Sequence, residues 1–87
     1  MPSINVEGFE LQIRPRDHPP PHVHVFRAEG EAKITLGSKD ERPRIWQVWE
    51  MSKKDLVRAL GLTIEYQAEL LKMWERFHGE AGSMGNP

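Results

Sequence analysis

Residues 17 to 36 read Asp-His-Pro-Pro-Pro-His-Val-His-Val-Phe-Arg-Ala-Glu-Gly-Glu-Ala-Lys-Ile-Thr-Leu. After the three prolines, polar and apolar side chains alternate on both sides of Glu29-Gly30, a pair of residues typical of a hairpin turn. This pattern predicts two antiparallel strands, residues 22–27 and residues 31–36, joined by a tight turn.

Weaker strand signals flank this hairpin. Phe9, Leu11 and Ile13 alternate with polar residues, which indicates a half-buried strand. Residues 3–6 form a candidate strand before it, and residues 45–49 form a candidate fifth strand after a polar loop. The chain is therefore expected to contain an antiparallel sheet of three to five strands.

The last third of the chain carries a helical pattern. Ser52-Lys-Lys-Asp55 resembles a capping box, and apolar residues then recur at helical spacing. This stripe comprises Leu56, Leu60, Ile64, Ala68, Leu71 and Trp74. One straight helix over residues 53–78 would be about 39 Å long at about 1.5 Å per residue, which is long for so short a chain. We therefore expect a kink or a break between Gly61 and Gln67.

Together these elements predict an α+β fold. The C-terminal helices, one kinked helix or two, are expected to cover the apolar face of the small antiparallel sheet. Residues 1–79 are expected to form a single domain, and the glycine-rich residues 80–87 a flexible tail.

Composition and charge argue against several classes of protein. The sequence has no cysteine, so it can form neither a disulfide nor a thiolate metal site. Twelve basic residues against 13 acidic ones give a net charge of -1, which does not indicate a nucleic-acid partner. A leader pattern and an apolar run long enough to cross a membrane are both lacking from this sequence, so a cytoplasmic protein without a membrane partner is expected.

The chain resembles a bacterial family, the domain of unknown function numbered 4160. The resemblance rests on Asp17-His18-Pro19-Pro20-Pro21-His22-Val23-His24, on Gly30-Glu31-Ala32-Lys33-Ile34 and on Glu69-Leu70-Leu71 followed by Trp74. It covers roughly residues 3–79, and the family has no established activity. Members are commonly encoded beside another small protein in pairs that resemble toxin–antitoxin operons. The resemblance thus implies a protein partner from a neighbouring gene, with a homodimer as another arrangement.

His22 and His24 are the main candidates for a functional site. Side chains alternate between the two faces of a strand, so these two imidazoles are expected on one face, together with Phe26. Their role can be purely structural, through hydrogen bonds to neighbouring groups. Alternatively they bind a divalent metal such as zinc, with Asp17, His18 or His78 as a third ligand. No other cofactor is expected.

Catalysis is the third alternative. One imidazole would act as base and the other as acid in a metal-independent phosphodiesterase or ribonuclease of the toxin type. Lys33, Arg14 or Arg16 would neutralise the phosphate. Asp17 either caps the turn before the prolines or orients a histidine by accepting its N–H. Both an enzyme and a binding module are compatible with these residues.

Two further expectations concern surfaces. Trp74 lies on the apolar stripe of the helix and is expected in the core. Trp46 and Trp49 follow a loop of mixed charge, which favours contact with a protein partner. The histidine-bearing face is expected to be open, with residues 17, 18, 22 and 24 around one surface cleft.

Overall fold

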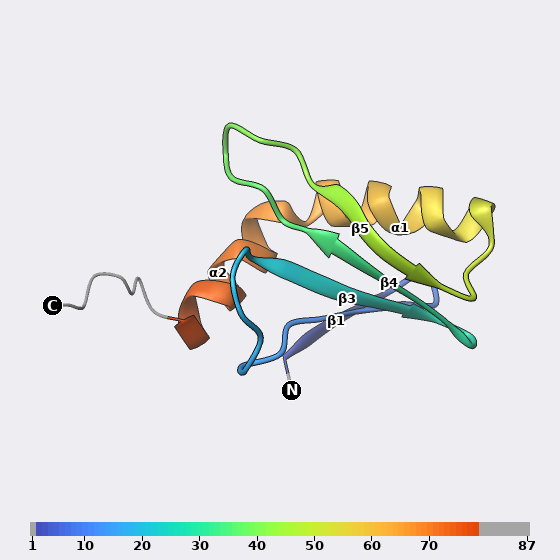
Figure 1. Cartoon of the computed structure of the whole chain (residues 1–87), viewed down its shortest axis with the longest axis horizontal. Coiled ribbons are helices and arrows are strands. Elements are labelled where there is room, and N and C mark those ends of the chain that lie inside the picture. Colours follow the sequence, from blue (N-terminus) through green and yellow to red (C-terminus); the bar gives the residue numbers. More distant parts are fainter. Residues whose placement is uncertain (1, 79–87) are drawn as a thin grey trace, which may run out of the picture.

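Five antiparallel strands and two helices follow one another along the chain in the computed structural model, which describes residues 2–78 (Figure 1). The strands are β1 (Ser3–Val6), β2 (Phe9–Gln12), β3 (His22–Arg27), β4 (Gly30–Thr35) and β5 (Arg44–Trp49), and the helices are α1 (Lys53–Glu65) and α2 (Gln67–His78). The strands form one sheet in the order β1-β2-β3-β4-β5. The predicted α+β class is therefore confirmed. The predicted tail, residues 80–87, lies outside the described residues.

The register of the sheet separates two faces. Leu11, Val25 and Ala32 lie side by side on neighbouring strands and belong to the buried core. The core face, on which they lie, is covered by α1, which packs on β3 and β4. The opposite face, here called the histidine face, carries Gln12, His22, His24, Phe26 and Lys33. The alternation predicted for residues 22–27 is confirmed, because His24 pairs with Lys33 whereas Val25 pairs with Ala32.

A β-bulge interrupts the regular pairing of β4 with β5. Ile34 pairs with Ile45, and Lys33 pairs with Gln47, so Trp46 is an extra residue on β5. Its ring lies on the histidine face, where the Lys33 ammonium is 4.5 Å from the ring centroid. The Trp46 indole therefore lies on the histidine face, beside Lys33.

The helical segment breaks where the sequence predicted. The Ser52 hydroxyl accepts a hydrogen bond from the Asp55 backbone N–H at 3.1 Å, which caps the start of α1. Tyr66 ends that helix with a non-helical φ of -103° and ψ of 16°. The Gln67 side-chain nitrogen then lies 2.7–2.9 Å from the carbonyl oxygens of three residues in and near the β4–β5 loop, Leu36, Ser38 and Glu41. This contact anchors the first residue of α2.

The two helices take different positions relative to the sheet. In Figure 1, α1 runs along the sheet, whereas α2 turns past the end at which β3 begins. Trp74 on α2 is buried, as predicted, and its ring centroid is 5.4 Å from that of His22. Neither described helix is long and apolar enough to cross a membrane.

Candidate functional site

Asp17, His22 and His24 converge at the end of the sheet near α2. One carboxylate oxygen of Asp17, Oδ2, lies 3.0 Å from His22 Nε2 and 2.7 Å from His24 Nε2. The two imidazole centroids are 5.2 Å apart. His22 and His24 are only 3% and 5% exposed, whereas the Asp17 side chain is 24% exposed. The site is thus a buried histidine pair with a carboxylate between it and solvent.

The loop that carries Asp17 is held by α2. Nε2 of His78, the last residue of that helix, lies 2.8 Å from the Asp17 carbonyl oxygen. The His78 ring also stacks on Trp74, with centroids 3.7 Å apart. The peptide bond between Pro19 and Pro20 is cis. His78 therefore positions the Asp17 backbone and is outside the group of convergent side chains.

The second nitrogen of each buried imidazole has a partner of its own. His22 Nδ1 lies 2.8 Å from the Pro20 carbonyl oxygen, which can only accept, so Nδ1 carries the proton. His24 Nδ1 lies 3.1 Å from Glu31 Oε2, and an ionised carboxylate likewise only accepts. Both rings are therefore oriented with Nε2 towards Asp17.

The surroundings shift two pKa values in the site. Burial lowers the pKa of His22 below its ordinary value and outweighs the opposing effects of the Pro20 carbonyl and the Asp17 charge. Burial raises the pKa of Asp17, but the opposing effects of His24, His22 and Arg14 together are larger, so the pKa lies below its ordinary value. The favoured state at neutral pH thus has a neutral His22 and an ionised Asp17.

These shifts predict that the protein loses stability in acid. Between the ordinary pKa of 6.5 and the lower folded-state pKa of His22, the unfolded chain binds a proton that the folded chain does not bind. Stability should therefore fall as the pH falls below about 6.5, and again below the ordinary Asp17 value of 3.8. Urea unfolding across this pH range measures the effect. The first decrease should be smaller in His22→Gln, and a decrease of equal size in that variant would contradict the assignment to His22.

Aromatic rings cover the histidine pair, so the expectation of an open histidine face is wrong at its centre. The His22 centroid lies 5.2 Å from that of Trp46 and 5.4 Å from that of Trp74, and Phe26 stacks beside His24 at 6.5 Å. The bulge supplies Trp46, and the turn of α2 past the end of the sheet supplies Trp74. Phe26 does lie on the histidine face, as predicted.

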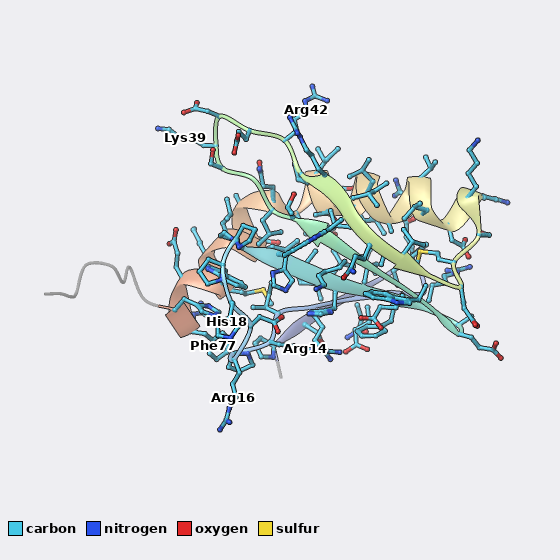
Figure 2. The ribbon with its side chains drawn as sticks, viewed as in Figure 1. Arg14, Arg16, His18, Lys39, Arg42 and Phe77 are labelled. Atoms are coloured by element: carbon cyan, nitrogen blue, oxygen red, sulfur yellow. The ribbon has the colours of Figure 1, made fainter. Side chains whose placement is uncertain are left out.

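The other candidate residues are more dispersed. His18 is exposed, and Figure 2 shows it beside the end of α2, outside the cluster of ligand atoms. Lys33 does share the histidine face, as the register with His24 shows. The Arg14 charge contributes to the lowered pKa of Asp17, whereas Arg16 is exposed and points away from the protein in Figure 2.

Glu31 is a site residue that the sequence reading missed. It pairs with Phe26 across the β3–β4 hairpin, so it is a diagonal neighbour of His24 on the same face. Counting the register outward from the hairpin turn would have placed its carboxylate near that histidine. This count requires the exact position of the hairpin turn, and the sequence pattern predicted the turn one residue too far along the chain.

The geometry favours metal binding over acid–base catalysis. The imidazole and carboxylate ligand atoms of Asp17, His22 and His24 all lie within 4.8 Å of one another, a group suited to one metal ion. By contrast, Asp17, His22 and His24 do not line four hollows on the surface of residues 2–78. A catalytic pair needs space for a substrate beside it, and the rings of Trp46 and Trp74 restrict that space around His22.

Comparison with known proteins gives one match. The family model described as "Domain of unknown function (DUF4160)" matches residues 8–75. The matched region includes the three convergent side chains, Glu31 and most of both helices. No curated protein and no solved structure matches the chain significantly.

Proposed function

Because the chain belongs to the DUF4160 family, whose function is unknown, we propose that it is the binding component of a two-gene, toxin–antitoxin-like pair. Its partner, the product of a neighbouring gene, binds along the free edge of β5. The operon arrangement is what the family resemblance implies, and the binding surface follows from the sheet.

The observation that carries this proposal is the exposure of β5. This strand is the last in the sheet, and all six of its residues are exposed. Four of them are large apolar residues that are each about 40% exposed: Ile45, Trp46, Val48 and Trp49. Proteins usually protect such an edge, because it is a template for pairing with another strand. An edge this apolar is typical of a surface that a partner covers.

The shape and charge of the edge support a particular kind of partner. An extended segment that adds a sixth strand would pair with the free backbone groups of β5 and place alternate side chains on each face. Arg44 is exposed at the start of β5, and Lys39 and Arg42 project from the preceding loop in Figure 2. We therefore expect an apolar strand with an acidic residue near the end that meets Arg44.

Replacing Val48 with glutamate tests this interface. The variant should bind the co-expressed neighbouring gene product at least about 30-fold more weakly, because a charge would be buried without a partner. Val57→Glu is the matched control, since this valine is 65% exposed on α1, away from the edge. Affinity can be measured by calorimetry on purified proteins. Equal binding by both variants would overturn the proposal.

Two other outcomes would replace the proposed binding role with a different one. If the chain alone is a dimer that Val48→Glu dissociates, β5 pairs with a second copy instead. If expression of the chain alone arrests a bacterial host, and His24→Ala or Lys33→Ala removes the arrest, the chain is an enzymatic toxin. Harmless expression combined with a stable Val48-dependent complex supports the binding role.

A further inference from the structure

We propose that Asp17, His22 and His24 bind one divalent transition-metal ion, through Oδ2 of the aspartate and Nε2 of each histidine. The site lies beside the proposed partner surface, because Trp46 of β5 contacts His22, but metal binding can be tested on the chain alone. Of the three third ligands considered from the sequence, only the Asp17 carboxylate belongs to the group, and His18 and His78 do not.

A count of protons on the two imidazoles supports the site. Two neutral rings carry two N–H groups, and both are used at Nδ1, towards Pro20 and Glu31. The two Nε2 lone pairs then face the same Asp17 oxygen at 3.0 and 2.7 Å. Three electron-rich atoms thus meet with no donor among them. Such an arrangement in a buried site requires a positive charge at its centre.

One additional proton satisfies only part of this arrangement. A proton on His24 Nε2 would complete the 2.7 Å contact with Asp17. At the 3.0 Å contact, the His22 Nε2 lone pair would still face a carboxylate oxygen. Because His22 is only 3% exposed, water has little access to reduce this repulsion. A metal ion bound by all three atoms would replace both contacts, with the ligand atoms moved apart to about 3.3 Å around it.

The donor set indicates the class of metal. Imidazole nitrogens favour Zn²⁺, Cu²⁺, Ni²⁺ or Fe²⁺ over Mg²⁺ and Ca²⁺. Two histidines and one carboxylate leave at least one position for water, and the partly exposed Asp17 lies on the solvent side of the site. Metal-binding histidines usually donate their second N–H to a carbonyl or carboxylate, as His22 and His24 do to Pro20 and Glu31.

Calorimetric titration of tag-free, chelator-treated protein with ZnCl₂ tests the proposal. We expect one ion per chain. Asp17→Asn should bind at least about 100-fold more weakly, since it removes a ligand, and Glu31→Gln about 10–100-fold more weakly, since it loosens the His24 orientation. His18→Ala is the control and should bind as the wild type does. Failure of the wild type to bind, or unchanged affinity in Asp17→Asn, would overturn the site.

A second measurement needs no variant and so does not depend on folding of the mutants. Zinc added to ¹⁵N-labelled wild-type protein should shift the Nε2 resonances of His22 and His24 and leave those of His18 unchanged. Shifts confined to His18 or His78, or a loss of affinity in His18→Ala, would mean that the ion binds only adventitiously at the surface.

Discussion

Replacing Trp74 with alanine is expected to lower the free energy of unfolding by about 3–5 kcal/mol, the range for loss of a large aromatic side chain from a packed core. Trp74 is 5% exposed and belongs to the hydrophobic core. Its ring also contacts His22 and stacks on His78. For 87 residues, a total stability of about 4–13 kcal/mol is typical, so this loss should remove a large share of it.

Phe77→Ala is the matched control for this experiment. Phe77 lies on the same helix and is also aromatic, but it is 41% exposed and lies at the surface in Figure 2. Its removal should cost about 1 kcal/mol or less. Urea unfolding followed by circular dichroism gives both values. If the two substitutions cost the same, Trp74 does not join α2 to the core and to the histidine pair.

Local patterns were enough to predict the elements of this fold. The alternation around residues 22–27 predicted which side chains of β3 enter the core, and Val23 and Val25 are indeed fully buried. The length of the helical pattern predicted a break, which the structure places at Tyr66. Both predictions depend on the periodicity of a single element, which the sequence displays directly.

The surroundings of the histidine pair could not be predicted in the same way. The cover over His22 depends on a bulge at Trp46 and on the direction that α2 takes past the sheet, and each is set by contacts between distant segments. The role of Glu31 depends on the strand register. With Glu29-Gly30 as the turn, Glu31 would pair with Ala28 and not with Phe26, which places it two residues further along the sheet from His24, so an error in the turn is enough to hide its role.

The position of the β3–β4 turn leads to a second prediction with a large expected effect, which concerns Gly30. The sequence predicted Glu29-Gly30 as the turn, but the structure places Ala28 and Glu29 there, and Gly30 is the first residue of β4. A glycine is needed at position 30 for a different reason: the segment between β5 and α1 passes close to its Cα atom. A Cβ atom at Gly30 would lie 2.5 Å from the Glu50 carbonyl oxygen and 2.9 Å from the Met51 Cα.

Gly30→Ala is therefore expected to destabilise the protein by about 1–3 kcal/mol or more, because main-chain atoms must move to admit the methyl group. Gly61→Ala makes the same chemical change within α1, where the nearest neighbour of the new Cβ is the end of the Arg58 side chain at 3.6 Å. There alanine should stabilise the protein by about 0.5–1 kcal/mol, since it favours the helical backbone. Urea unfolding of the two variants should thus give shifts of opposite sign. Shifts of the same sign would contradict the close packing of Gly30 against Glu50 and Met51 in the connection between β5 and α1.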